Sequence, residues 1–251
     1  MKGLIDIHAH ILPGVDDGAS DFQESVRMLK SAYRQGVRCV IATPHYHRNH
    51  FHRNPERSME ALQKIRGWLR EHLPDMIVLL GTEIYYTIDF AEEIAAGNIF
   101  PMAKSRYLLV EFSPLEDYAY IRNAVHVLVN RGYCPIIAHA ERYRVFHQNV
   151  SRVSEVIQLG AYIQLNGDSI VGKNGLRMKL FAQKLMKKEL VHFVASDMHH
   201  MESRRPNLKE CAEYMEKTYG FARTKELLYD NPRKLIENKL IEELLQRKEN
   251  I

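Results

Sequence analysis

The chain has 251 residues, of which 45% are hydrophobic and 26% charged, and 35 basic against 31 acidic residues give a net charge of +4. This composition is typical of a globular protein that buries its own core, and it excludes disorder as the main theme. The basic residues are scattered, so bulk nucleic-acid binding is not indicated. No apolar run is long enough to span a membrane and the first residues lack a signal-peptide pattern, so we expect a cytoplasmic protein without stable membrane insertion.

Short apolar runs, rich in β-branched and aromatic residues, predict strands that are buried on both faces. In chain order these strands are expected at Leu4–His8, Val37–Thr43, Ile77–Leu80, Tyr107–Phe112, Cys134–Ala138, Ala161–Leu165 and Val191–Ala195. Apolar residues at helical spacing predict helices between them, at Asp21–Arg34, Pro55–Leu73, Tyr120–Arg131, Val150–Leu159, Leu176–Lys188 and Leu208–Tyr219. Residues 231–251 have the pattern of a final amphipathic helix that opens at Asn231 and Pro232.

Signals at the helix ends support these boundaries. Asp21 followed by Glu24 is an N-terminal capping pattern. Gly36, Gly132 and Gly160 stand where three of the helices should stop.

The alternation of strands and helices predicts an α/β fold with a parallel sheet, either doubly wound or closed into a barrel. The segment after the first strand, 8–14, contains no glycine-rich dinucleotide fingerprint, which weakens the doubly wound alternative. No linker or shift in composition divides the chain, so we expect a single domain over residues 1–251.

Most of the predicted strands carry a His, Asp or Glu at or just beyond their carboxyl ends. In an α/β barrel these ends meet at one edge, where catalytic groups are assembled. The pairs His8/His10 and Asp197/His199 are each two residues apart, so both members of a pair can face the same side of an extended chain. The candidate metal ligands are His8, His10, Asp17, His45, Glu83, Glu111, His139, Asp197 and His199.

Imidazoles and carboxylates without thiolates suit Mn, Fe or Zn. The candidates are too many for one ion, whereas two or three ions with a bridging carboxylate would use the whole set. Clustered ions lower the pKa of a bound water and clamp the oxygens of a phosphoryl group during its displacement. The residue types therefore indicate metal-dependent hydrolysis.

Other polar residues have less decisive contexts. His126 and His192 lie away from strand ends and are interpreted as structural. Asp16 is expected to support the site or to cap its loop, although it could exchange roles with Asp17. The segment 46–53 is rich in His and Arg, and it is either a solvated loop or a wall that meets an anionic or aromatic substrate.

Several motifs resemble the PHP (polymerase and histidinol phosphatase) superfamily. More narrowly, they resemble the bacterial protein-tyrosine phosphatases of capsule and exopolysaccharide gene clusters, the CpsB/CapC type. The opening run from Asp6 to Gly18, with its paired aspartates, carries the resemblance, and so do segments 35–38, 42–45, 83–86, 111–112, 137–143, 195–199 and 230–234. The resemblance extends over nearly the whole chain.

The resemblance implies a distorted (β/α)7 barrel, similar to a TIM barrel, and a cluster of up to three divalent ions, often Mn. Glu83 would bridge the first two ions. The implied ligand groups are His8, His10, Glu83 and Asp197 for the first ion; Glu83, Glu111 and His139 for the second; and Asp17, His45 and His199 for the third.

The resemblance also implies the reaction. Arg142 and Arg204 match basic residues that hold the substrate phosphate, with the adjacent Arg205 as an open alternative to Arg204. A metal-activated hydroxide would attack phosphotyrosine, whose phenolate leaving group, with a pKa of about 10, needs less help from an acid than an alkoxide does; a nearby His or a water could supply the proton. The substrate would be a bacterial tyrosine kinase that regulates capsule or exopolysaccharide synthesis.

The three cysteines point away from a thiol mechanism. Cys39, Cys134 and Cys211 form no CxxC pair, and none has an Arg six residues later, as the CxxxxxR loop of cysteine phosphatases requires. No cysteine nucleophile is expected.

Three other functions compete with this interpretation. A small-molecule phosphomonoesterase, such as a histidinol-phosphate phosphatase, would use similar ligands. A phosphodiesterase or nuclease should carry a more basic surface than a net charge of +4 provides. A metal-binding scaffold that tethers a kinase without chemistry would not require an intact ligand set.

Overall fold

The computed structural model describes residues 3–47 and 55–241. Within these residues all strand pairs are parallel, in one sheet of order β1-β2-β4 and another of order β3-β5-β6-β7-β8-β9. The strands are β1 Leu4–Ala9, β2 Val37–Ala42, β3 His45–Tyr46, β4 Ile77–Leu80, β5 Glu83–Tyr85, β6 Tyr107–Glu111, β7 Cys134–Ile137, β8 Tyr162–Asn166 and β9 Phe193–Ala195.

The last strand returns to the first. The backbone N–H of His10 donates to the carbonyl of Met198 at 2.9 Å, and that of Asp197 donates to the carbonyl of His8 at 2.9 Å. These two bonds, with the parallel bridge between Ala9 and Met198, join the end of β9 to β1. The strands therefore curve into a distorted barrel, as expected from the sequence.

Two of the seven expected strands are each followed by a short strand that was not predicted, which accounts for the nine strands of the described residues. β2 ends before Thr43 and Pro44, and β3 follows them. β4 ends before Gly81 and Thr82, and β5 follows them. A Cβ at Gly81 would lie 2.5 Å from the Sδ of Met102, so only glycine fits this break. After each break, the chain pairs with strands of the second sheet instead of the first. This change of partner distorts the barrel.

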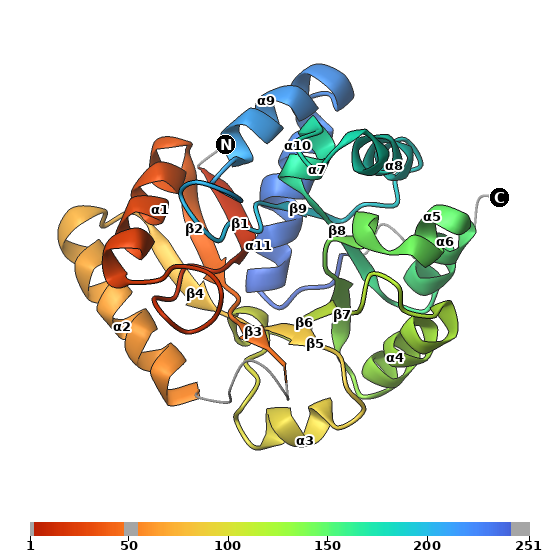
Figure 1. The fold of residues 1–251 in the computed structure, drawn as a ribbon, viewed down its shortest axis with the longest axis horizontal. Helices are drawn as coiled ribbons and strands as arrows, with labels where there is room; N and C mark the ends of the chain where they lie inside the picture. Colours follow the sequence, from red (N-terminus) through yellow and green to blue (C-terminus); the bar gives the residue numbers. More distant parts are fainter. Residues whose placement is uncertain (1–2, 48–54, 242–251) are drawn as a thin grey trace.

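The helices form a ring around the strands (Figure 1). The six predicted helices are present, with ends within two residues of those expected: α1 Phe22–Arg34, α2 Pro55–His72, α4 Tyr118–Asn130, α6 Ser151–Gln158, α8 Leu176–Lys187 and α9 Leu208–Tyr219. Shorter helices were not predicted: α3 Phe90–Ala95, α5 Arg144–Gln148, α7 Gly167–Val171 and α10 Phe221–Lys225, the 3-10 turns Met102–Lys104 and Ala140–Arg142, and the π-helical turn Glu226–Asp230. No helix in the ranges that the structure describes is long and apolar enough to cross a bilayer.

The capping signals in the sequence are confirmed. The side chain of Asp21 accepts a hydrogen bond from the backbone N–H of Glu24 at 2.8 Å. Gly36, Gly132 and Gly160 have φ angles of 89°, 84° and 111°, in the left-handed region that glycine adopts without strain.

The C-terminal segment closes one end of the barrel. The expected long helix over 231–251 is wrong in its extent, because α11 (Asn231–Ile236) ends at Ile236 and residues 242–251 lie outside the described residues. Leu235 and Ile241 pack with inward side chains of the strands, and the hydroxyl of Tyr107 donates to the carbonyl of Lys239 at 2.8 Å. The segment therefore fills the interior, and α11 crosses behind the strands in Figure 1.

Candidate metal centre

Alternation along the strands places the acidic side chains at one end of the barrel interior. The inward side chains of the strands form an apolar cluster inside the barrel, the inner core, and the side chains between strands and helices form the outer core. On β6, Tyr107 and Leu109 belong to the inner core, and Glu111 is the next residue of the same face. On β9, Phe193 and Ala195 pack in the inner core, and Asp197 continues their spacing. Because successive side chains of a strand alternate between faces, the inner core is capped by carboxylates at the carboxyl ends of the strands.

An irregularity in β1 brings two histidines to the same edge. Ile5 and Ile7 belong to the inner core, whereas Ala9 packs in the outer core under the helices. The register with β2 shifts between Asp6 and Ala9, which changes the face that each residue presents. His8 and His10 are both fully buried and bring their Nε2 atoms within 3.2 Å of each other.

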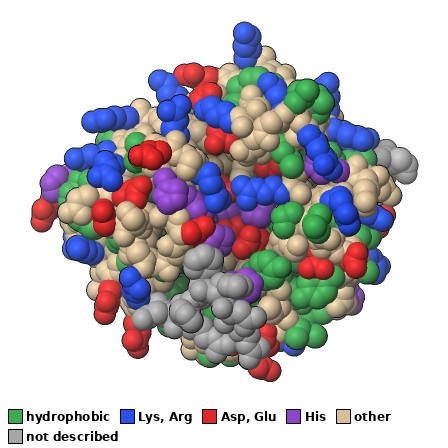
Figure 2. Space-filling view, in the orientation of Figure 1, with side chains coloured by type: hydrophobic (Ala, Val, Ile, Leu, Met, Phe, Trp, Pro, Cys, Tyr) green, Lys and Arg blue, Asp and Glu red, His purple; other side chains and the backbone are tan. Residues whose placement is uncertain are grey.

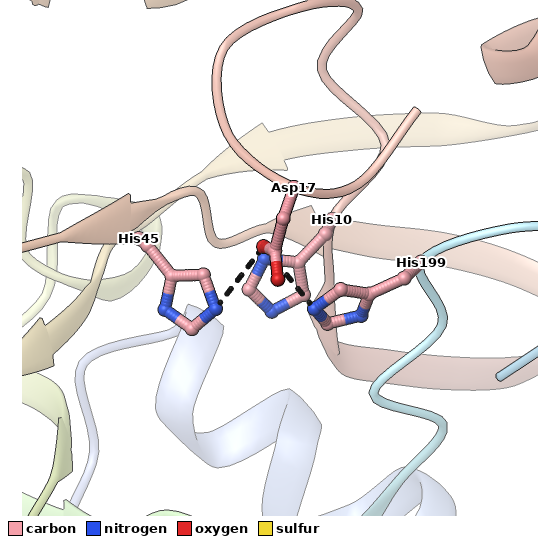
Figure 3. A group of neighbouring side chains, drawn as sticks. All are labelled: His10, Asp17, His45 and His199. Atoms are coloured by element: carbon pink, nitrogen blue, oxygen red, sulfur yellow. Dashed lines mark ion pairs between the residues drawn. The ribbon is translucent and has the colours of Figure 1, made fainter. Parts of the chain in front are cut away.

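The structure brings eight of the nine predicted ligands into three overlapping groups, in each of which the ligand atoms lie within 4.8 Å of one another. Figure 3 shows one group, with the Asp17 carboxylate between the rings of His45 and His199 and the ring of His10 behind it. The groups are His8, His10, Glu83 and Asp197; His10, Asp17, His45 and His199; and His45, Glu83 and Glu111.

The grouping differs from the expected one at His45 and His139, and also at His10, which belongs to two groups instead of one. The Nδ1 of His45 lies 3.3 Å from Glu83 and 3.2 Å from Glu111, while its Nε2 lies 3.4 Å from Asp17. His45 therefore stands between two groups rather than in one. His139 lies beside the same carboxylates, with its Nε2 at 2.9 Å from Glu83 and 3.5 Å from Glu111.

Glu83 lies at the centre of the cluster and its contacts fit a bound cation. Its side chain is 1% exposed, and the Nε2 atoms of His8 and His10 lie 2.9 and 3.1 Å from its Oε2. Despite these short distances, Oε2 receives no hydrogen bond, and neither does the Nε2 of His199. Buried donor and acceptor atoms are normally paired. Unpaired ligand atoms that converge in this way fit a site for metal ions.

Hydrogen bonds at Nδ1 orient three of the imidazoles so that Nε2 faces the cluster. The Nδ1 atoms of His8, His10 and His199 lie 3.2, 2.7 and 3.0 Å from oxygens of Gln164, Asp16 and the Asp197 backbone. A ring that donates from Nδ1 carries its lone pair on Nε2. All three rings therefore turn Nε2, the nitrogen that can bind a metal ion, towards the cluster.

Asp16 supports the site, which is one of the roles expected for it. Its carboxylate contacts the Nδ1 of His10 at 2.7 Å and accepts from the backbone N–H groups of Gly18 and His45, both at 3.0 Å. The side chain of Asp17 is 51% exposed and lies 3.6 Å from the Nε2 of His199. The two neighbouring aspartates thus contact opposite sides of the cluster.

Burial disfavours the charged form of every group here, and the partners decide which groups remain charged. For Glu83, burial acts to raise the pKa, but the surrounding imidazoles outweigh it and hold the pKa well below its usual range. For His139, burial acts to lower the pKa, but hydrogen bonds to Glu111 and Glu83 raise it to about 9. The carboxylates are therefore ionised, and the centre attracts cations.

Two arginines converge on one carboxylate. Arg142 and Arg204 donate to the two oxygens of Asp197, at 3.0 and 2.6 Å, and their side chains are 33% and 37% exposed. Their guanidinium groups thus reach from the buried cluster to the surface, and basic and acidic side chains gather near the histidines in Figure 2. Arg205 is exposed and lines a different hollow with Gln35 and Glu213.

Three residues of the site have a strained backbone conformation. His139, Asp197 and Arg204 have φ angles of 35°, 54° and 50°, which are costly for residues other than glycine. Surrounding hydrogen bonds must hold these conformations, because each residue would relax out of them alone.

Sequence reasoning assigned no role to three buried polar residues beside the ligands. Gln164 and Asn166 follow Tyr162 at inward positions of β8, and Glu141 precedes Arg142. The alternation Tyr162, Gln164, Asn166 is the signal that could have placed the two amides in the interior.

The remaining expectations concern residues outside the cluster. The three cysteines are buried, and burial raises the pKa of the Cys39 thiol to about 12. His192 is buried and its Nδ1 accepts from the backbone N–H of Ile163 at 2.9 Å, which agrees with a structural role. In segment 46–53 the ring of His47 packs against Tyr85, and residues 48–53 lie outside the described residues.

A distorted parallel barrel whose carboxyl edge carries overlapping groups of imidazoles and carboxylates defines a metal-dependent hydrolase. The family model for capsular polysaccharide synthesis, CpsB/CapC, matches residues 4–237, and this chain belongs to that family. The resemblance seen in the sequence is thereby confirmed.

Individual relatives match over most of their length. The chain is 38% identical over 243 residues to the tyrosine-protein phosphatase CpsB of Streptococcus pneumoniae, covering 95% of this chain and 100% of the relative. It is 34% identical over 239 residues to the tyrosine-protein phosphatase YwqE of Bacillus subtilis, covering 95% and 93%.

Solved structures share the fold. A structure from a study of YwqE from Bacillus subtilis and CpsB from Streptococcus pneumoniae, described as unique metal-dependent tyrosine phosphatases, matches with a TM-score of 0.88 and 33% identity, covering 95% of this chain and 96% of that one. The phosphotriesterase homology protein from Escherichia coli matches with a TM-score of 0.62 and 15% identity, covering 94% and 99%, and shows the fold alone.

Proposed function

We propose that the nine side chains of the cluster hold divalent metal ions, up to three and preferably Mn, with which this metal-dependent tyrosine phosphatase of capsule synthesis hydrolyses phosphotyrosine. The observation that carries the proposal is the unpaired Oε2 of Glu83, fully buried among imidazole nitrogens at 2.9 and 3.1 Å. The donor set has imidazoles and carboxylates and no thiolate, which suits Mn and also accepts Fe or Zn. The set consists of His8, His10, Asp17, His45, Glu83, Glu111, His139, Asp197 and His199.

When bound, such ions lower the pKa of a water and offset negative charge on a phosphoryl group. The chain's own residues supply the frame. Glu83 contacts members of every group and would bridge ions, while Asp16 and the Asp197 backbone hold His10 and His199 in the required orientation. Because these partners are buried and preformed, little reorganisation is needed when substrate arrives.

Arg142 and Arg204 would hold the substrate phosphate. Each arginine donates one N–H to Asp197 and has further donors on a partly exposed side chain. A planar guanidinium suits bidentate contact with phosphate oxygens. The two arginines would fix the phosphate over the cluster and stabilise charge that develops on its oxygens. Support for Arg204 over Arg205 comes from the contact with Asp197.

The substrate we propose is a phosphorylated tyrosine of a bacterial tyrosine kinase that regulates capsule or exopolysaccharide synthesis. We propose that the enzyme acts on this kinase in the cytoplasm. The family's link to capsular polysaccharide synthesis supports this choice, as do relatives that are tyrosine-protein phosphatases. The phenolate of tyrosine leaves more readily than an alkoxide, so the site needs less help from a general acid than it would for an alkyl phosphate.

The experiment compares two substrates on one preparation. Phosphate release from a phosphotyrosine peptide and from histidinol phosphate is measured on chelated protein, before and after Mn is added. We expect turnover of the peptide that depends on Mn and exceeds turnover of histidinol phosphate. A preference for histidinol phosphate would contradict the substrate assignment, and equal turnover without metal would contradict the mechanism.

A further inference from the structure

One strand of the barrel ends at the metal centre without supplying a ligand. The inward side chains of β8 at this end are Gln164 and Asn166, which are 0% and 2% exposed. Both are neutral amides, and burial of an amide without hydrogen bonds is costly. Their contacts therefore indicate why the strand carries them.

The two amides form a chain of hydrogen bonds with a single possible direction. The backbone N–H of His139 donates to Oε1 of Gln164 at 2.8 Å, which fixes that atom as the acceptor. The Nε2 of Gln164 then donates to Oδ1 of Asn166 at 2.9 Å. The Nδ2 of Asn166 in turn donates to Oδ2 of Asp197 at 2.6 Å. A backbone donor at one end and a carboxylate at the other leave no alternative amide orientation.

This direction determines which nitrogen of His8 faces the cluster. The Nδ1 of His8 lies 3.2 Å from the same Oε1 of Gln164, which accepts and cannot donate. The Nδ1 of His8 must therefore carry a proton, which leaves Nε2 as the nitrogen that can bind a metal ion. That Nε2 atom lies 2.9 Å from Glu83 and 3.3 Å from Asp197.

The same chain holds two strained residues. His139 and Asp197 have φ angles of 35° and 54°, and each is bonded to one end of the amide pair. Asn166 is anchored in turn, because its backbone N–H donates to Glu141 at 3.2 Å. Glu141 is fully buried and also accepts from the hydroxyl of Ser169 at 2.6 Å.

We propose that Gln164 and Asn166 are positioning residues of the metal centre, which act as one unit to set the tautomer of His8 and the orientation of Asp197. The inference rests on the proposed function, because it concerns ligands of the proposed ions. Neither amide contacts the reacting atoms. Their effect is to prepare ligand atoms before a metal binds, as partners of metal ligands commonly do.

The test measures Mn binding to metal-free protein by titration calorimetry, without substrate. Gln164→Met and Asn166→Leu remove the amides at similar volume, and each should weaken Mn binding about 10- to 100-fold. The double variant should bind Mn about as weakly as the weaker single variant, because the residues act through one chain. Gln164→Glu keeps an acceptor for His8 and His139, and it should bind Mn more tightly than Gln164→Met.

Asn231→Leu is the matched control. Asn231 is also a buried amide, but it donates to the carbonyl of His192 at 2.9 Å, away from the ligands. It should lower the unfolding temperature and leave Mn affinity unchanged. Circular dichroism establishes that each variant is folded, and Asn166→Leu carries the test if Gln164→Met is not folded.

Two results would overturn the inference. One is wild-type Mn affinity in folded Gln164→Met and Asn166→Leu, and the other is an equal loss of affinity in Asn231→Leu. Absence of Mn binding by the wild-type protein would instead overturn the proposed function, so the two failures are distinguishable.

Discussion

The Nε2 atoms of His8 and His10 lie 3.2 Å apart in the interior of the barrel. The Nδ1 of each ring faces an oxygen acceptor, on Gln164 and Asp16 respectively. The two Nε2 atoms therefore face each other, and two lone pairs would repel at this distance unless a proton or a metal ion is shared. We therefore expect a cation at this point to stabilise the fold.

Metal removal should therefore destabilise the protein. Addition of Mn to chelated protein at about 100 times its Kd should stabilise the fold by about 2.7 kcal/mol, which raises the unfolding temperature by roughly 5–10 °C. Glu83→Gln, which lacks the central carboxylate, should show a smaller rise. Thermal unfolding followed by circular dichroism measures both. An unfolding temperature that is insensitive to Mn would contradict a structural role for the ions.

Loss of either arginine that contacts Asp197 should impair catalysis. Arg142→Ala and Arg204→Ala should each lower kcat/KM for a phosphotyrosine peptide about 100-fold, or ~2.7 kcal/mol, because each removes a charged donor to the phosphate. Lysine at either position should restore only part of the activity, since it lacks the planar fork. Steady-state kinetics at saturating Mn measures the effect.

Arg205→Ala is the control for these variants. Arg205 is exposed and lies in a different hollow, so its loss should leave kcat/KM nearly unchanged. Metal content is determined for each variant, because both arginines contact a proposed ligand. A large loss in Arg205→Ala together with normal activity in Arg204→Ala would reverse the assignment.

Replacement of all three cysteines by alanine should leave activity per folded molecule unchanged. Cys39, Cys134 and Cys211 are buried, and burial raises the pKa of each thiol, so that none forms a reactive thiolate. Phosphate release by the triple variant measures the outcome. Inactivity of a folded, metal-loaded triple variant would show that a thiol takes part.

His192 should make the fold sensitive to acid. Burial and then the charge of Arg223 lower its pKa to about 3, whereas an unfolded histidine has a pKa of about 6.5. Between these values the unfolded chain binds a proton that the folded chain does not. This contribution to stability is complete above about pH 6.5 and is lost as the pH falls, by at most about 1.4 kcal/mol per pH unit.

His192→Asn tests this dependence because asparagine keeps an acceptor for the N–H of Ile163 and cannot titrate. The free energy of unfolding in urea is measured at about pH 6.5, 5.5 and 4.5. The variant should lose less stability than the wild type over this range. Parallel curves for the two proteins would contradict the assignment to His192.

Sequence patterns predicted the strands and long helices because they depend on local periodicity and capping. The breaks at Pro44 and Gly81 were not predicted, since the close approach of Met102 to Gly81 arises only when the barrel closes. The tail was expected to be one helix, but α11 ends at Ile236, and Ile241 packs in the barrel interior. Tertiary packing overrode the helical pattern in that segment.

The candidate ligands could be predicted because they are chemically distinctive and follow strands. The membership of one ligand in two groups could not be predicted, since it depends on ring orientation. His45 faces Asp17 with one nitrogen and Glu83 with the other. No role could be assigned to Gln164 and Asn166 from the sequence, because amides are common and the role of these two is defined only by their contacts.

The central claim is that phosphotyrosine hydrolysis depends on ions held by this cluster. The most direct measurement titrates chelated protein with Mn and determines, on the same samples, the metal bound per chain and the phosphate released from a phosphotyrosine peptide. We predict that activity rises only as ions bind and saturates at two or three per chain. Full turnover by protein that contains no metal would contradict the account.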